Sequence, residues 1–413
     1  MSSRPAFACE ALESRRLLTA HGLNATYFNN PNFTGSTATR IDQGVNSDFG
    51  DHARPASGVK GNTYSIRWDG LVRAAYSEPY TFTVHNNDGV RLWVAGQLII
   101  DAWKTSKRGD HSGSIDLKRK HYYDLRLEYF DSVRTAAIRL SWSSVSTPKT
   151  VVPTKRLFAY DDRFAAIGDF GRTTPYATGT AQIVLGWAPD FIVTAGDNTY
   201  TSAGYDGNVG IFYHSYIGNY KGVHGKGSKT NRFWPTLGNH DSTGAYEDFF
   251  TLPGNERYYD FVRGDVHFFM INSNKGEPDG TSPTSAQGQW LKAHLATSTS
   301  LYNVVMFHHS PFSSGHHANV GYMRWPFKEW GADVVIAGHD HDYERLIEGG
   351  LLYFVDGAGA GPRSIGSPIP GSKFMNNTDS GAMLIQANEI AMTFQFELRN
   401  GKVIDSYTIA PNA

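Results

Sequence analysis

Two patterns of hydrophobic and polar positions divide the chain. From residue 23 to about 142, short apolar segments alternate with polar positions and are separated by turn residues. The segment 90–94 (VRLWV) shows a period of two, and the preceding 86–89 (NNDG) predicts a turn. The same pattern predicts further strands at 80–84, 98–100, 122–130 and 136–142. Because no helical period interrupts them, we expect an all-β sandwich or barrel.

From Arg156 onward, apolar strands alternate with helical segments. Strands are predicted at 191–195 and 332–337, and helices at 176–188 and 285–296, the second beginning with Ser285 as its N-cap. A strand-rich stretch, 382–409, follows. This order predicts an α/β layered sandwich. The Ser/Thr/Pro-rich segment 143–155 predicts a linker, so we expect a tail at 1–20 and domains at 21–158 and 159–413.

Composition excludes several classes of function. Lys and Arg number 38 and Asp and Glu 39, a net charge of −1, which argues against a broad basic surface for nucleic acid. A lone Cys9 excludes an intrachain disulfide and a cysteine-based metal site. No apolar run reaches the ~20 residues of a membrane span. A soluble globular chain is expected.

Five predicted strands in the second half end on residue types that bind metals. They are followed by Gly168-Asp169, Gly196-Asp197, Gly238-Asn239-His240, His308-His309 and Gly338-His339-Asp340-His341. Carboxyl ends of strands in an open α/β sheet form the usual functional crevice, and glycine lets the chain turn there without Cβ strain. Each of these short motifs is common on its own, and a single one more often has a structural role than a metal-binding role. Five in order predict convergence on two metal ions bridged by a carboxylate.

This set resembles the calcineurin-like metallophosphoesterases over roughly residues 160–413, with two sheets flanked by helices. Tyr200, three residues after Asp197, makes it similar to the purple acid phosphatases. The resemblance implies that one metal is held by Asp169, Asp197, Tyr200 and His341. It implies that the other is held by Asp197, Asn239, His308 and His339, with Asp197 bridging. A phenolate favours Fe(III), beside a divalent Fe, Zn or Mn; the alternative is that Tyr200 only anchors a strand end.

Because His308 and His309 are adjacent, the motif leaves open which of them is the metal ligand. The family pattern places the ligand first and a further histidine nine residues later, which selects His308 and His317; His309 and His316 are the fallback pair. His240 and His317 resemble the residues that bind phosphate and protonate the leaving group. The mechanism expected is in-line attack of a metal-bound hydroxide on phosphorus.

The resulting hypothesis is hydrolysis of phosphomonoesters, as in acid phosphatases. One alternative is a phosphodiesterase acting on nucleotides or surface polymers, and another is a glycan-binding protein with a vestigial catalytic domain. The polar, Gly-rich segments 201–232 and 273–283 are expected to shape access to the site, and a monoester preference would require them to crowd out a second ester arm.

The N-terminal half resembles the PA14 domain, a β-sandwich that binds carbohydrate in many members. The resemblance rests on spaced aromatic residues and glycines at 22–28, 65–70, 80–82, 88–94 and 127–129. Sugar-binding relatives hold calcium with an Asp-Asp pair, where this chain has Asn87-Asp88, so a spacer domain is the alternative. Residues 11–20 (ALESRRLLTA) resemble a tag of exported bacterial proteins, implying an extracellular or periplasmic location; the alternative is a turn of amphipathic helix.

Overall fold

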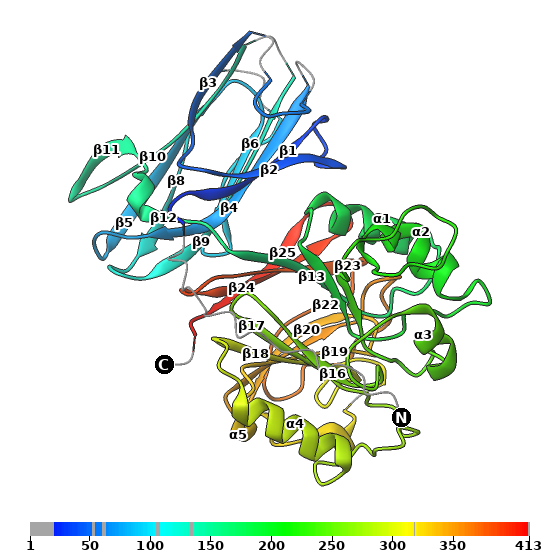
Figure 1. Ribbon diagram of the computed structural model, residues 1–413. Coiled ribbons are helices and arrows are strands. Elements are labelled where there is room, and N and C mark those ends of the chain that lie inside the picture. Colours follow the sequence, from blue (N-terminus) through cyan, green and yellow to red (C-terminus); the bar gives the residue numbers. More distant parts are fainter. Residues whose placement is uncertain are drawn as a thin grey trace, which may run out of the picture.

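The computed structural model describes residues 20–51, 54–59, 63–104, 108–132, 135–317 and 319–411. The described chain forms two layered bodies, an N-terminal one drawn in blue and cyan and a C-terminal one drawn in green to red (Figure 1). The expected tail and export tag at 1–20 lie outside the described residues, except for Ala20. Among the described helices, none has the length and apolar character needed to cross a membrane.

The N-terminal body is the expected all-β sandwich. One sheet runs in the order β2 (Ser36–Asp42), β1 (Leu23–Phe28), β4 (Tyr64–Arg73), β9 (Tyr122–Asp131), β6 (Val90–Val94) and β7 (Gln97–Ala102), with β12 (Leu157–Phe158) on β4. The other runs in the order β11 (Thr147–Val151), β10 (Thr135–Ser144), β5 (Glu78–Asn86) and β8 (Gly109–Leu117), with β3 (Asn46–Asp51) on β10. Alternate residues of both sheets, including Trp68, Tyr80 and Trp142, form one buried core between them.

The linker predicted at 143–155 is wrong for most of its length. β11 pairs antiparallel with β10, and Val152 is buried in the sandwich core. The β-branched residues Thr147, Thr150 and Val151 favour a strand. Pro148 is compatible with it because β11 lies at the edge of its sheet, where a missing N–H costs no ladder hydrogen bond.

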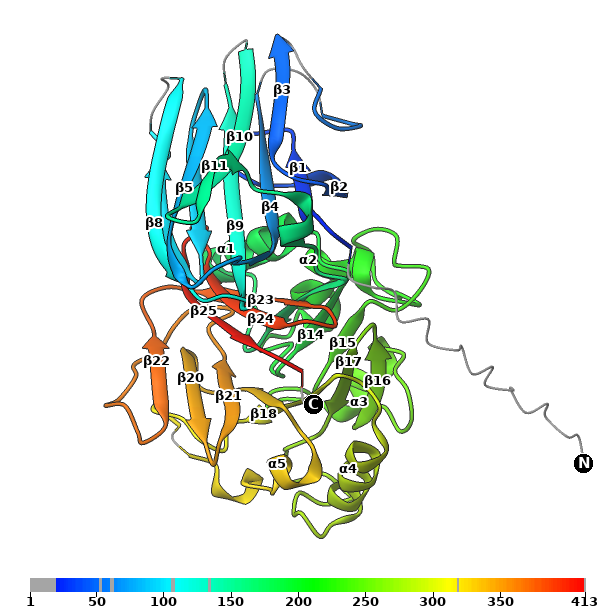
Figure 2. The same cartoon turned by 90° about the vertical axis from the view of Figure 1, so that its left-hand side faces the viewer.

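The C-terminal body consists of two mixed sheets with few helices, consistent with the predicted α/β sandwich (Figure 2). The first sheet runs in the order β15 (Phe233–Pro235), β14 (Phe191–Thr194), β13 (Asp162–Ile167), β23 (Gly381–Ala387), β24 (Met392–Leu398) and β25 (Val403–Ile409). The second runs in the order β16 (Tyr259–Arg263), β17 (Val266–Met270), β18 (Tyr302–His309), β19 (Val334–Gly338), β21 (Leu351–Asp356), β20 (Tyr343–Glu348) and β22 (Ser372–Asn376). Phe164, Phe191, Phe268 and other apolar residues of both sheets share one core.

The helices are α1 (Pro175–Gly186), α2 (Ile211–Tyr213), α3 (Thr243–Phe249), α4 (Ala286–Thr297) and α5 (Phe327–Trp330). Both predicted helices are present, as α1 and α4. Thr174 caps α1 by accepting a hydrogen bond from the Ala177 amide, and Ser285 caps α4 by accepting one from the Gly288 amide. The caps explain why these two segments begin where the sequence indicates.

Parallel pairing decides where the site can form. β13, β14 and β15 run parallel, as do β17, β18, β19 and β21. Their carboxyl ends therefore share an edge of each sheet, and the predicted ligands follow those ends.

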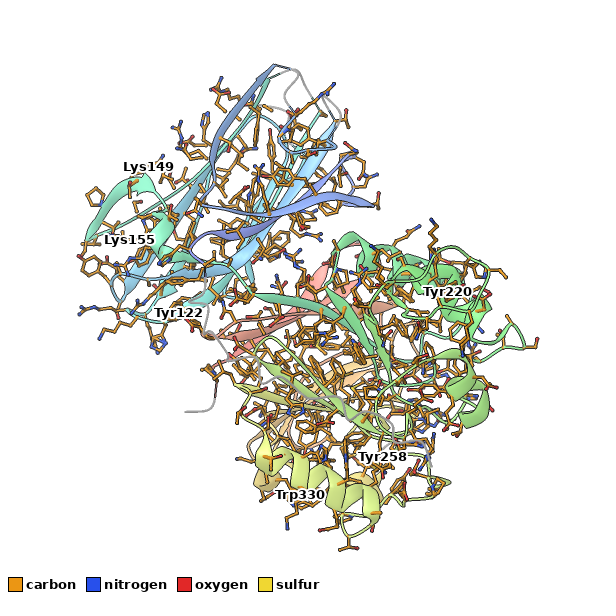
Figure 3. All side chains as sticks on the ribbon, viewed as in Figure 1. Tyr122, Lys149, Lys155, Tyr220, Tyr258 and Trp330 are labelled. Atoms are coloured by element: carbon orange, nitrogen blue, oxygen red, sulfur yellow. The ribbon has the colours of Figure 1, made fainter. Side chains whose placement is uncertain are left out.

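A buried ionic network joins the two bodies. Arg126 of β9 pairs with Asp69 of β4 at 2.8 Å and with Glu397 of β24 at 2.9 Å, and Arg163 of β13 reaches Asp69 at 3.4 Å. An apolar cluster lies beside it, with Leu71, Phe158, Tyr160 and Ala391 buried and Tyr122 (labelled in Figure 3) packed against them. The bodies are thus in direct, desolvated contact.

Candidate metal centre

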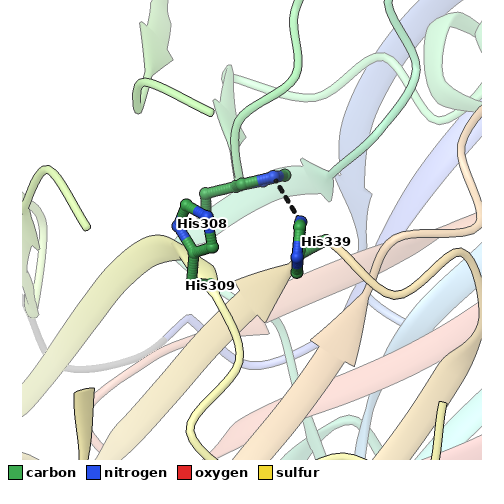
Figure 4. Close-up of side chains that lie close together, drawn as sticks. All are labelled: His308, His309 and His339. Atoms are coloured by element: carbon green, nitrogen blue, oxygen red, sulfur yellow. Dashed lines mark hydrogen bonds between the residues drawn. The ribbon is translucent and has the colours of Figure 1, made fainter. Parts of the chain in front are cut away.

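The first half of the candidate centre gathers around His308. Its Nε2 lies 2.9 Å from Asn239 Oδ1, 3.5 Å from Asp197 Oδ1 and 3.2 Å from His339 Nδ1. Figure 4 shows the contact between His308 and His339, with His309 beside them. The structure therefore brings together the four residues expected to form one metal site.

The second half gathers around Tyr200. Its hydroxyl donates to Asp169 Oδ1 at 2.9 Å and lies 3.2 Å from His341 Nε2, which is 3.4 Å from Asp169 Oδ1. Asp169, Asp197 and His308 each offer a ligand atom within 4.8 Å of the others. The two halves thus adjoin, with Asp197 in contact with residues of both.

The backbone at the strand ends differs from expectation. Of the four glycines that precede ligands, only Gly196 has a positive φ, of 85°. The left-handed conformation falls instead on three expected ligands, Asp169 (φ 55°), Asp197 (φ 52°) and His339 (φ 74°). Gly238 is required for close approach, because a Cβ there would lie 2.2 Å from Asp197 Oδ1. Backbone strain at residues whose side chains meet at one point is typical of a functional site.

The two adjacent histidines take different places. His308 Nδ1 lies 2.9 Å from the carbonyl oxygen of Ala195, which turns Nε2 toward Asn239 and Asp197. His309 Nδ1 instead lies 2.8 Å from Ser273 Oγ. His308, His309 and His339 still offer ring nitrogens within 4.8 Å of one another, so His309 borders the centre. Its ring forms a hydrogen bond with Ser273 and, among the described residues, none with Asn239 or Asp197.

Electrostatics favour metal binding here. Burial, and next the charge of Asp197, raise the pKa of Asp169 well above its usual value. Burial lowers the pKa of His308 to about 3, of His339 to about 2 and of His341 to about 4, so these imidazoles are neutral and able to bind a cation. Burial and the charges of Asp169 and Asp197 raise the pKa of Tyr200, so a phenolate there requires a bound cation. The donor set fits metal ions.

His240 and His317 lie on two sides of the centre. The His240 amide donates to Asp197 Oδ1 at 2.9 Å, and its ring lies 4.6 Å from that of Tyr200. The His317 ring stacks on His339 at 4.3 Å, and its Nε2 is 3.3 Å from Arg363 Nη1. Both side chains are exposed. Each side chain is placed where it can contact a substrate bound at the centre.

Three polar residues near the centre were not assigned from sequence. The Arg172 guanidinium lies 4.4 Å from the Tyr200 ring centroid, and Arg363 contacts His317. Asp241 accepts hydrogen bonds from the Gly238 amide and the Asn198 side chain, each at 2.8 Å, and so fixes the turns after β14 and β15. Asp241 belongs to the Gly238–Asp241 motif and could have been found there; Arg363 carries no local signal.

A cavity of about 810 Å³ opens beside the centre. Its lining includes Asn239 and His309 at the centre, Asp241 and Thr243, and residues of the segments 272–278 and 319–322. The segment 273–283 was expected to shape access, and part of it does so. None of the residues lining this cavity comes from 201–232.

The N-terminal pair Asn87-Asp88 is buried at a turn. The amide of Ser132 donates to Asp88 Oδ2 at 3.2 Å and its hydroxyl to Asp88 Oδ1 at 3.3 Å. The carboxylate therefore stabilises the turn. Calcium binding and carbohydrate binding at this pair stay predictions, as does export.

Comparison with known proteins finds a matching family model for each body. Residues 19–155 match the PA14 domain model, and residues 162–343 match the calcineurin-like phosphoesterase model. Anti-sigma-I factor RsgI3 of Acetivibrio thermocellus is 41% identical over 143 residues, 35% of this chain and 22% of that protein. The solved structure of GAP50, the anchor in the inner membrane complex of Plasmodium, aligns with a TM-score of 0.48 and 18% identity over 61% of this chain and 89% of its own.

The C-terminal body also matches purple acid phosphatases. Purple acid phosphatase 15 of Arabidopsis thaliana is 26% identical over 231 residues, 47% of this chain and 42% of that protein. Tartrate-resistant acid phosphatase type 5 of Rattus norvegicus is 27% identical over 239 residues, 48% of this chain and 72% of that protein. This chain thus spans 22% of RsgI3 and 42% of the Arabidopsis enzyme. It carries a PA14 domain in its N-terminal part and a calcineurin-like phosphoesterase domain in its C-terminal part.

Proposed function

We propose that the protein is a metal-dependent phosphoesterase that hydrolyses phosphomonoesters. The observation that carries the proposal is the convergence of carboxylate, amide, imidazole and phenol donors around Asp197 at the ends of parallel strands. The matches to purple acid phosphatases over this domain support it.

In the proposed centre, one metal ion would be held by Asp169, Asp197, Tyr200 and His341. The other would be held by Asp197, Asn239, His308 and His339. The Tyr200 oxygen favours Fe(III) in the first site, with Fe, Zn or Mn as a divalent ion in the second. When bound, such ions supply Lewis acidity, which polarises a phosphoryl oxygen and lowers the pKa of water.

The chain's own side chains supply the remaining steps. His240, Arg172 and the pair of His317 with Arg363 border the centre and are positioned to donate hydrogen bonds to phosphoryl oxygens. Water forms the new P–O bond as the bond to the ester oxygen breaks, and His240 or His317 delivers the proton that the leaving alcoholate takes up. The proton that the water loses restores the histidine. Phosphate and an alcohol are the products.

A second candidate is hydrolysis of phosphodiesters. The cavity of about 810 Å³ beside Asn239 and His309 leaves room for a second ester arm, which a strict monoesterase would exclude. The geometry of the metal centre is compatible with either substrate.

The deciding experiment compares 4-nitrophenyl phosphate with bis(4-nitrophenyl) phosphate from acidic to alkaline pH. The visible spectrum and metal content are recorded on the same sample. Monoester turnover at acidic pH by a coloured, iron-containing protein supports the proposal. A preference for the diester selects the second candidate, and absence of turnover with two metals bound contradicts both.

A further inference from the structure

The cavity beside the metal centre is lined partly by residues of the centre and partly by segments outside it. We call it the leaving-group cavity; its lining includes Asn239, His309, Asn274, Lys275 and Tyr322. Asn239 and His309 stand at the centre, where the phosphoryl group of a substrate is expected. A leaving group that extends from the centre into this cavity passes His309, whose ring lies 6.3 Å from that of Tyr322.

Lys275 supplies a positive charge farther along this cavity. Its Nζ lies 5.4 Å from the Tyr322 ring centroid, and the Tyr322 hydroxyl donates to the Ser273 carbonyl oxygen at 2.7 Å. The Tyr322 ring is therefore fixed to the same segment that carries Lys275. This contact holds the ammonium group against the wall of the cavity.

The carboxylates that line the cavity do not neutralise Lys275. Glu277 accepts hydrogen bonds from Arg257 and Asn272, and Asp241 accepts them from Gly238 and Asn198. Among the described residues, no carboxylate forms an ion pair with Lys275, whose side chain is exposed. An anionic group entering the cavity thus meets a cation without a competing partner.

Lys275 lines the same cavity as His309, and Tyr322 is close to both. The Tyr322 ring centroid lies 6.3 Å from that of His309 and 5.4 Å from Lys275 Nζ. His309 borders the centre, so a group between His309 and Lys275 lies in the field of both the metal ions and this ammonium. Such a location favours negative charge on the leaving group.

We propose that Lys275 is a specificity-determining residue that selects phosphate esters whose leaving group carries a second anionic group, such as a carboxylate or another phosphate. The inference rests on the proposed phosphoesterase activity. It assigns the cavity beside His309 to the leaving group and excludes neutral alcohols as the preferred products.

The test uses two substrates of matched shape, 4-carboxyphenyl phosphate and 4-carbamoylphenyl phosphate. The first carries an anionic group and the second a neutral amide in the same place. Phosphate release gives kcat/KM for each substrate with the wild type, Lys275→Gln and Lys275→Arg. Lys292→Gln, on the exposed face of α4, is the matched control.

We expect Lys275→Gln to lower the ratio of the two kcat/KM values about tenfold, the size of one charge-assisted hydrogen bond. Lys275→Arg retains the ratio, and Lys292→Gln leaves both activities unchanged. Added salt lowers the ratio of the wild type more than that of Lys275→Gln.

Two outcomes overturn the inference, and they are distinguishable. Hydrolysis of both substrates with the same ratio in the wild type and in Lys275→Gln overturns it and leaves the proposed activity in place. Absence of hydrolysis of either substrate by the metal-loaded wild type overturns the proposed activity, and this inference with it.

Discussion

Tyr200 is the residue whose chemistry most narrows the identity of the metals. Its hydroxyl lies between Asp169 Oδ1 and His341 Nε2, where a phenolate would bind the same ion as both. Tyr200→Phe removes this oxygen and keeps the ring under Arg172. We expect the wild type to show a visible absorption band. The variant should lack this band and should bind less iron. Absorption spectra and metal analysis check this, with Tyr258→Phe as control; a coloured Tyr200→Phe protein would contradict it.

His240 and His339 allow catalysis to be separated from metal binding. His240 contacts Asp197 through its backbone amide, so its ring is free for substrate, whereas the ring of His339 contacts His308. We expect His240→Ala to lower turnover at least about a hundredfold and to retain its metals. His339→Ala should lose both turnover and metal. Turnover assays with metal analysis of the same samples check this, and equal loss of metal in both variants would make His240 a structural residue.

At the scale of residues, the sequence predicts those members of the candidate site that belong to short motifs at the ends of strands. Asn239 and His240 follow one strand, and His339 and His341 another, so their approach depends only on strand order. The contact of Arg363 with His317 joins residues 46 positions apart, in segments without regular structure. No local pattern encodes such a contact, because it depends on how two loops pack.

At the scale of elements, pattern and capping predicted the existence of strands and helices better than their limits. The segment 143–155 has the composition of a loop, which predicts a linker. Its central part instead forms β11, which pairs with the edge of β10. After β13, β14 and β19, glycine is expected to let the chain turn without Cβ strain. A positive φ falls instead on Asp169 and His339, and after β14 on Asp197 as well as Gly196. The glycines allow close packing, because a Cβ at Gly168, Gly196 or Gly338 would lie within 3.0 Å of a neighbouring atom.

Asp162, at the start of β13, makes the stability of this domain depend on pH. Burial, with the charges of Asp190, Asp265 and Asp161 adding to it, raises the pKa of Asp162 to about 7. Because the folded-state pKa is raised, the stability contributed by this group is full below the unfolded pKa and is lost as pH rises through about 7. Asp162→Asn removes the charge that must be buried.

We expect Asp162→Asn to gain stability relative to wild type between pH 5.5 and 8.5, by about 1–2 kcal/mol after allowance for its partial exposure. Urea unfolding of both proteins at the two pH values measures it. The exposed Asp116→Asn should show no such gain. A variant that loses stability relative to wild type at pH 8.5 would show that the carboxylate is stabilised in its charged form.

At the scale of the whole molecule, the relation between the two domains is the part that sequence did not predict. Arg126 and Glu397 are 271 positions apart, and each belongs to a strand whose alternation predicts a half-buried face. A charged residue on such a strand is expected to face solvent. The burial of Arg126 depends on the other domain, which adds Glu397 as a second opposite charge to Asp69 of its own domain.

Arg126 therefore tests whether the two domains unfold together. Arg126→Met keeps most of the side-chain volume and leaves Asp69 and Glu397 buried without their shared cation, at a cost of about 3–5 kcal/mol. Because Asp69 and Glu397 belong to different domains, their repulsion acts on the interface first. We expect calorimetry to show one unfolding transition for the wild type and two, the first at lower temperature, for the variant.

Lys149→Met breaks the exposed pair with Asp110 and should cost less than about 1 kcal/mol without splitting the transition. A single transition shifted equally in both variants would show that the buried network does not couple the domains.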